Sequence, residues 1–169
     1  MSVKISQLHL SDFMLFQQAD FQWSPGINVI CGTNSTGKTA LIKLMYSLHK
    51  SYEQWNSTET KEAAVNRFSE KLCGVFRPDN GKVGRLVRRK QGNAQMTASM
   101  GYENGTSIDV NFGNRASKIA TLILPKMEHT ASPDHTAVYF PPKEIISATE
   151  NFTSLYEAVS YTHLTLPTN

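Results

Sequence analysis

Apolar and polar side chains alternate along the first part of the chain, which is the pattern of strands that place one face against a core. The alternation predicts two extended segments, residues 3–10 and 15–23, with a corner at residues 11–14 between them. A Pro-Gly turn at residues 24–26 then leads into a short apolar run, residues 27–31. We predict that this run is a strand and that Cys31 lies at its buried end.

From residue 40 the apolar spacing changes to that of helices. A first helix is predicted to pack one face on a sheet and to end near residues 50–51. The residues of that face are Leu41, Leu44, Met45 and Leu48. A second helix is predicted from residues 56–58 to Phe76, where residues 77–81 stop it. Its apolar residues at helical spacing are Val65, Phe68, Leu72 and Val75.

Beyond the second helix the period returns to two, which indicates strands with one wet face. An antiparallel meander is predicted, with strands at residues 84–90, 94–102 and 106–112 and hairpin turns at 91–93 and 103–105. Short apolar runs at residues 120–124 and 137–140 predict two more strands, separated by a loop at residues 128–134, and residues 145–158 are predicted to be helical.

The junction before the first helix carries the pattern G-x-x-x-x-G-K-[ST]. Its eight residues are Gly32, Thr33, Asn34, Ser35, Thr36, Gly37, Lys38 and Thr39. Such a loop points backbone N–H groups and the positive end of the helix dipole at phosphate oxygens. Lys38 is expected to neutralise the β- and γ-phosphates of a nucleoside triphosphate, and the Thr39 hydroxyl is the expected Mg²⁺ ligand. A glycine-rich loop that only caps the helix is the alternative.

Composition narrows the class of protein only slightly. The chain has 169 residues, 40% of them hydrophobic, which is enough for one domain with a core. Its net charge of +3 does not by itself indicate a nucleic-acid partner. Two cysteines without metal-ligand spacing fit a reducing compartment, and neither a signal peptide nor a membrane span is recognisable. We therefore expect a soluble, cytoplasmic protein without a membrane partner.

These features resemble the amino-terminal lobe of the ABC-class chromosome and repair ATPases, the SMC, RecF and OLD-like group, whose members are often labelled AAA-type ATP-binding proteins. The resemblance covers roughly residues 2–158. It rests on the corner at Asp12-Phe13, the stretch of residues 25–30 before the loop, Asn34 at the third loop position, and the Pro-Pro step at residues 141–142. It implies an α/β P-loop NTPase fold, an ABC-type head lobe with residues 84–113 as an inserted antiparallel β-subdomain.

The resemblance also implies a function. Proteins of this group bind ATP with Mg²⁺, dimerise around the nucleotide, and serve DNA repair, chromosome maintenance or phage defence, so a homodimer and DNA are the partners to expect. Hydrolysis in the group needs a Walker B strand that ends in Asp-Glu, a signature motif and a switch histidine, and none is found here. Asp109, for example, follows only one apolar residue, Ile108. We expect nucleotide binding without hydrolysis.

The missing motifs and the last residues indicate an amino-terminal fragment. Residues 159–169 contain no charged side chain apart from His163 and resemble a translated adapter sequence. We predict that this tail is non-native and that residues 1–158 are a partial ATP-binding domain.

Two other groups of side chains are candidates for ligand contact. Arg85, Arg88, Arg89 and Lys90 form a basic cluster that either touches DNA phosphates or is a solvated strand face. Phe13 and Phe16 either line an adenine pocket or belong to the core.

Two other functions fit the loop. One is a complete small P-loop kinase, which would need arginines in a lid and an acceptor pocket. The other is a non-catalytic interaction module whose loop senses nucleotide. A GTPase is disfavoured because the chain lacks an Asn/Thr-Lys-x-Asp motif.

Overall fold

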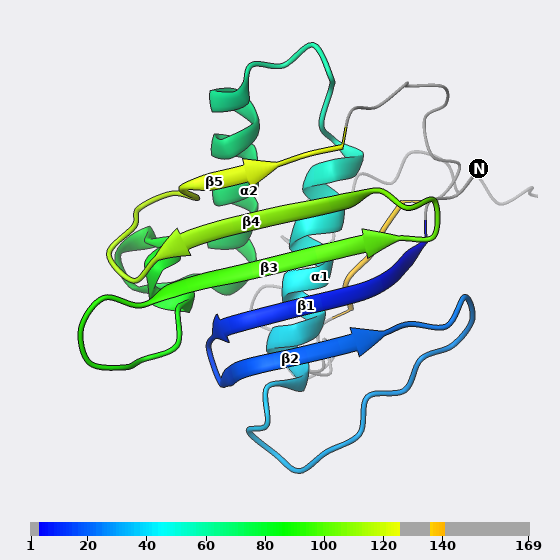
Figure 1. The fold of residues 1–169 in the computed structure, drawn as a ribbon, viewed down its shortest axis with the longest axis horizontal. Coiled ribbons are helices and arrows are strands. Elements are labelled where there is room, and N and C mark those ends of the chain that lie inside the picture. Colours follow the sequence, from blue (N-terminus) through cyan, green and yellow to red (C-terminus); the bar gives the residue numbers. More distant parts are fainter. Residues whose placement is uncertain (1–3, 126–135, 141–169) are drawn as a thin grey trace, which may run out of the picture. The chain divides into compact units, whose positions relative to one another are not determined.

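A five-stranded antiparallel sheet forms one layer of the structure (Figure 1). The structure is a computed structural model, and it describes residues 4–125 and 136–140. The strand order is β2-β1-β3-β4-β5, so the early hairpin and the later strands share one sheet. The strands are β1 Ile5–Phe13, β2 Phe16–Gln22, β3 Gln95–Tyr102, β4 Ser107–Gly113 and β5 Thr121–Ile123. Five of the predicted strands are thus confirmed, with small differences at their ends.

The strand register gives the sheet one apolar and one polar face. Leu8 lies opposite Met100, and Ala98 lies opposite Val110, so apolar residues of neighbouring strands meet on the same face. Met96, Met100, Ile108 and Phe112 on this face are fully buried. The opposite face carries polar residues, among them His9, Thr97 and Asp109.

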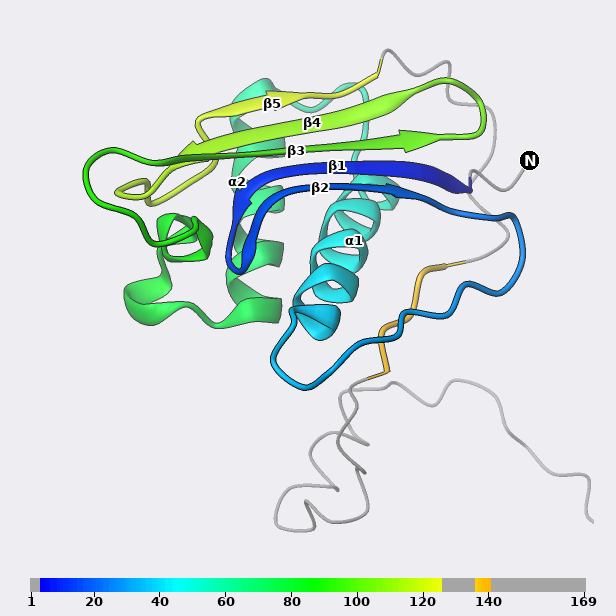
Figure 2. The ribbon, with the colours of Figure 1, turned by 60° about the horizontal axis from the view of Figure 1, so that its bottom comes forward.

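Both helices cover the apolar face, as Figure 2 shows. Helix α1 spans Lys38–Glu53 and helix α2 spans Lys61–Phe76. The predicted apolar faces are confirmed, because five of their residues are at most 1% exposed. These residues are Leu41, Leu44 and Leu48 of α1 and Phe68 and Leu72 of α2. The side chain of Thr60 caps α2 by accepting a hydrogen bond from the Ala63 N–H at 3.2 Å.

The prediction of a strand at residues 84–90 is wrong. A short 3₁₀ helix, η2 Val83–Leu86, stands there, preceded by another, η1 Asp79–Gly81. Val83, Leu86 and Val87 are buried at a spacing of three to four, which suits a helical turn better than a strand. Gly84 also lies so close to the chain opposite that a Cβ there would stand 2.7 Å from the Asn114 carbonyl.

The prediction of a strand at residues 27–31 is also wrong, because this apolar run forms no strand in the described structure. Ile27 and Val29 are 93% and 79% exposed, and Cys31 is exposed as well, so the expected burial of Cys31 is wrong. The preceding turn is ordered by the Asn28 side chain, which accepts from the Ser24 N–H at 2.9 Å and donates to the Gly26 carbonyl at 3.1 Å. The run therefore leaves a defined turn but pairs with no described strand.

A polar network links the carboxyl end of α1 to Tyr102 at the end of β3. His49 Nδ1 lies 3.0 Å from the Tyr102 hydroxyl, and His49 Nε2 lies 3.3 Å from the Glu53 carboxylate. The same carboxylate accepts hydrogen bonds from Lys50 Nζ and from the Ala137 N–H, each at 2.8 Å. In the neutral tautomer protonated at Nε2, His49 donates to Glu53 and accepts from Tyr102.

Burial and charge shift the protonation equilibria of this network. Burial lowers the pKa of His49, against the opposing effect of the Glu53 charge. Burial raises the pKa of Glu53, but hydrogen bonds from Lys50 and the Ala137 N–H outweigh it, and the net pKa is below the usual value. Burial raises the pKa of Tyr102. Neutral His49 and ionised Glu53 are therefore the forms that the fold favours.

The contacts divide the chain into two units, residues 1–138 and 139–169. All the elements above belong to the first unit. The prediction of a strand at residues 137–140 is wrong, because none of these residues is in a strand. The predicted loop at residues 128–134 and helix at residues 145–158 lie outside the described residues. None of the helices in the described part of the chain is long and apolar enough to cross a bilayer.

Candidate nucleotide-binding site

The predicted phosphate loop, residues 32–39, lies in the connection from β2 to α1, and its last two residues, Lys38 and Thr39, begin that helix. Gly37 is the residue before the helix, with a φ of 94° that side-chain-bearing residues rarely adopt. A Cβ on Gly37 would stand 2.8 Å from the ring of Phe16, because that ring lies against the loop. Both the backbone conformation and the close approach of Phe16 therefore require glycine.

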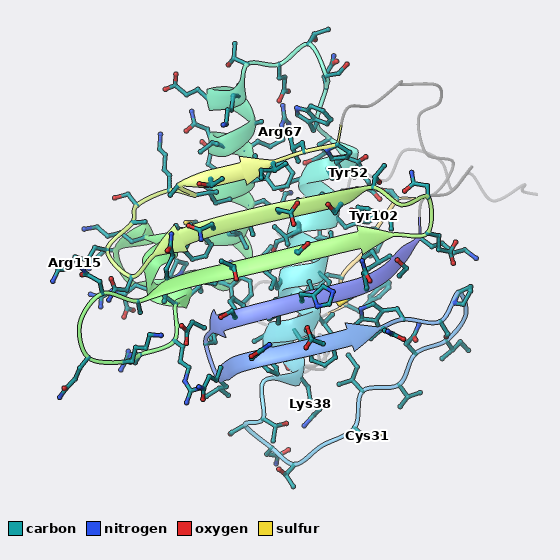
Figure 3. The ribbon with its side chains drawn as sticks, viewed as in Figure 1. Cys31, Lys38, Tyr52, Arg67, Tyr102 and Arg115 are labelled. Carbon is teal, nitrogen blue, oxygen red and sulfur yellow. The ribbon has the colours of Figure 1, made fainter. Side chains whose placement is uncertain are left out.

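Side chains of the loop bond to its own backbone. Lys38 Nζ donates to the carbonyls of Gly32 at 2.8 Å and Thr33 at 2.5 Å, and Figure 3 shows this side chain at the loop end of α1. The hydroxyl of Thr36 donates to the Thr33 carbonyl at 2.9 Å. Lys38 thus closes the loop on itself while its ammonium group stays at the solvent side, where a stronger acceptor can compete for it.

The first turn of α1 lacks the cap that α2 has. No side chain accepts a hydrogen bond at the N-cap of α1, whereas Thr60 does so in α2. The leading N–H groups of α1 therefore remain donors for an external acceptor.

An open groove of about 440 Å³ lies along the loop and the start of α1. Two lysines line it, Lys38 and Lys43, and no acidic residue does. Its other lining residues are Met14, Leu15, Asn34, Ser35, Thr36, Gly37, Thr39, Ala40 and Phe76. We call this the loop groove. Six of the eight predicted site residues line it, and the other two, Gly32 and Thr33, accept the hydrogen bonds of Lys38.

Sequence reasoning missed five residues of the loop groove. Met14 and Leu15 come from the corner between β1 and β2, and Ala40, Lys43 and Phe76 come from the two helices. The Met14 N–H donates to the Leu86 carbonyl at 2.8 Å, which fixes the corner beside the loop. Only Lys43 left a signal in the sequence, since it stands four residues after Thr39 and so shares its helix face.

The aromatic residues proposed for an adenine pocket do not line the loop groove. Phe13 is fully buried in the core, and Phe16 is partly buried against Gly37. The apolar wall of the groove is instead made by Met14, Leu15 and Phe76.

The donors of the groove suit Mg²⁺ only in company with a phosphate chain. Among the described residues, no group of three His, Cys, Asp or Glu side chains could hold a metal ion. Thr39 contributes a hydroxyl to the groove. Mg²⁺ is commonly held by few protein ligands together with substrate phosphates and water, which is the arrangement this donor set fits.

A second groove, of about 470 Å³, lies on the polar face of the sheet. Asp20 and Asp109 line this sheet-face groove, and no lysine or arginine does. An anionic ligand would be repelled there. The charge therefore favours the loop groove as the site for phosphate.

The basic cluster at residues 85–90 does not form the predicted strand face. Lys90 Nζ lies 2.5 Å from the Asp12 carboxylate, and Arg88 contacts the side-chain oxygen of Gln17 at 3.4 Å. One of its four charges is thus compensated within the fold.

A glycine-bounded loop that ends on a helix-initial Lys-Thr pair, beside a cationic groove, is characteristic of the P-loop nucleotide-binding proteins. Comparison with known families agrees, since the family model described as AAA domain matches residues 7–123. The chain belongs to the AAA domain family, within the SMC- and RecF-like group of P-loop ATPases. No solved structure matches it.

Curated relatives are similar to the chain over limited stretches. The DNA replication and repair protein RecF of Streptococcus equi subsp. zooepidemicus is 27% identical over 99 residues, which are 52% of this chain and 27% of that protein. RecF of Limosilactobacillus reuteri is 34% identical over 77 residues, 41% of this chain and 21% of that protein. RecF of Renibacterium salmoninarum is 46% identical over 41 residues, 24% and 10% of the two chains. The chain spans about a quarter of the length of these relatives or less.

Proposed function

We propose that the chain binds ATP together with Mg²⁺ through residues 32–39, as the Walker A part of an ATPase related to SMC and RecF proteins. The observation that carries the proposal is the loop groove, which combines an uncapped helix start with two lysines and no carboxylate. Lys38 would leave the Gly32 and Thr33 carbonyls for the β- and γ-phosphates. Thr39 would hold Mg²⁺ jointly with phosphate oxygens.

The wider biological role is a proposal that rests on the relatives. Because the matching proteins are named for DNA replication and repair, we propose that this chain serves DNA repair or a related process of chromosome maintenance or defence. We also propose that it is the amino-terminal lobe of an ABC-type head that dimerises around nucleotide. DNA contact, if the basic cluster provides it, would involve Arg85, Arg88 and Arg89, because Lys90 is paired with Asp12.

Isothermal titration with ATP and GTP, each with and without Mg²⁺, tests the proposed function. The chain is expected to bind Mg-ATP, and Lys38→Ala is expected to weaken this binding by about 100-fold or more, because a charge-assisted contact to phosphate is lost. The matched control is Lys61→Ala, which removes the same charge from an exposed position on α2.

Three outcomes would contradict the proposal. Unchanged affinity in Lys38→Ala would refute the assigned site. A strong preference for GTP would contradict the proposal that the bound nucleotide is ATP. Phosphoryl transfer to a small acceptor would favour the kinase alternative.

A further inference from the structure

The loop groove contains a second lysine that the loop motif does not include. Lys43 stands four residues after Thr39, so the two side chains lie on one face of α1. Its ammonium group lies 5.7 Å from the centre of the Phe76 ring. Phe76 packs edge-on against the buried ring of Phe13, with the ring centroids 5.8 Å apart. An anchored aromatic ring thus attracts the Lys43 charge to the wall of the groove.

Lys43 differs from Lys50 and Lys90 in having no counter-charge among the described residues. Lys50 Nζ lies 2.8 Å from Glu53, and Lys90 Nζ lies 2.5 Å from Asp12. Within residues 4–125 and 136–140, no ion pair includes Lys43, and no acidic residue lines its groove. Two lysines that line one groove without a carboxylate make that groove favourable for an anion.

The place of Lys43 along the groove indicates which part of a nucleotide it serves. Lys38 begins α1 at the loop, whereas Lys43 lies further along the helix beside Phe76, in the groove that Met14 also lines. If Lys38 holds the β- and γ-phosphates, the α-phosphate is the remaining anionic group of the ligand. The apolar wall formed by Met14 and Phe76 then faces the nucleoside.

We propose that Lys43 is a nucleotide-positioning residue that binds the α-phosphate, next to the apolar wall that receives the nucleoside. The inference rests on the proposed function. Since ATP and ADP share the α-phosphate, loss of the Lys43 charge lowers the affinity for both nucleotides by the same factor.

Titration of the whole 169-residue chain with Mg-ATP and Mg-ADP tests this role. Lys43→Met keeps the length and apolar character of the side chain and is expected to weaken both nucleotides about fivefold at about 0.05 M salt. The loss should shrink at about 0.5 M salt, because salt screens a charge contact in an open groove. Lys43→Arg should retain affinity. Lys61→Met, which removes an exposed charge from α2, is the control and should bind as the unaltered chain does.

The results separate this inference from the proposed function. If the unaltered chain binds neither nucleotide, the proposed function fails and Lys43 has no such role. If Lys38→Ala removes binding but Lys43→Met binds ATP and ADP normally at low salt, the role of Lys43 alone is refuted. A loss in Lys43→Met for ATP but not for ADP would refute the assignment to the α-phosphate.

Discussion

The two ends of helix α1 differ in whether their polar groups have partners within the protein. At the amino end, no side chain caps the helix, and Lys38 and Lys43 face a groove without a carboxylate. At the carboxyl end, His49 contacts both Glu53 and Tyr102, and Glu53 also accepts from the Ala137 N–H. Figure 3 shows Lys38 at one end of the helix and Tyr52 and Tyr102 together at the other.

The difference indicates a division of labour within a single helix. Polar groups that satisfy one another stabilise the fold, and they leave little capacity for a ligand. Polar groups that are left without fixed partners stabilise the fold less, but they can form strong hydrogen bonds and charge contacts with an anionic ligand. Substitutions at the carboxyl end should therefore change stability without changing nucleotide affinity, and substitutions in the phosphate loop should mainly change affinity.

The largest expected effect on stability is that of Glu53→Ala. The side chain of Glu53 is only 8% exposed, and its loss removes the acceptor of the Ala137 N–H and one contact each of Lys50 and His49. Urea unfolding should show a loss of about 2–3 kcal/mol. Glu53→Gln, which keeps an acceptor for the N–H but removes the charge, should lose less. A fall in ATP affinity comparable to that of Lys38→Ala would break the division between the two ends.

A smaller effect on stability, joined to a large effect on binding, is expected for Gly37→Ala. The new Cβ would require an unfavourable positive φ and would meet the Phe16 ring at 2.8 Å. The free energy of unfolding should fall by about 1–2 kcal/mol, and ATP binding should be lost because the loop moves. The double variant with Phe16→Leu should recover part of the stability by removing ring atoms. Normal ATP affinity in Gly37→Ala would show that the loop conformation is unimportant for binding.

The sequence predicted a segment well when the interactions that form it lie within the segment or next to it in the chain. Helices α1 and α2 and the hairpin of β3 and β4 follow from periodicity and turn residues, and the structure confirms them. Residues 27–31 show the opposite case. Their apolar character suits a strand, but a strand needs a neighbour, and none of the described strands lies beside them. No pattern within the run itself could reveal that.

The candidate site divides in the same way. The eight residues of the loop could be found because the motif is contiguous and each residue type has a chemical reason. The groove wall could not be found, because Met14 and Phe76 are far apart in the sequence and meet only through the fold. The prediction for residues 84–90 failed for a related reason, since the close approach of Gly84 to Asn114 is a tertiary contact.

The smallest expected effect concerns the pH dependence of stability at the carboxyl end of α1. Burial holds the pKa of His49 below its unfolded value of about 6.5, so protonation favours the unfolded chain. The stability that neutral His49 contributes is complete above about pH 7 and is lost as the pH falls through 6.5 toward the lowered folded-state pKa. His49→Gln should flatten this decline between pH 7 and pH 5, as measured by urea unfolding at several pH values.

Tyr102→Phe is the matched control for that measurement. It removes the hydroxyl that bonds to His49 Nδ1 but keeps the buried imidazole. Its stability should be lower at every pH, and the decline between pH 7 and pH 5 should persist. If His49→Gln showed the same decline as the unaltered chain, another group would be responsible for it. The contacts at the carboxyl end would then stabilise the fold without responding to pH. If His49→Gln instead flattens the pH dependence of stability and leaves ATP affinity unchanged, the pH response and the ligand response lie at opposite ends of one helix.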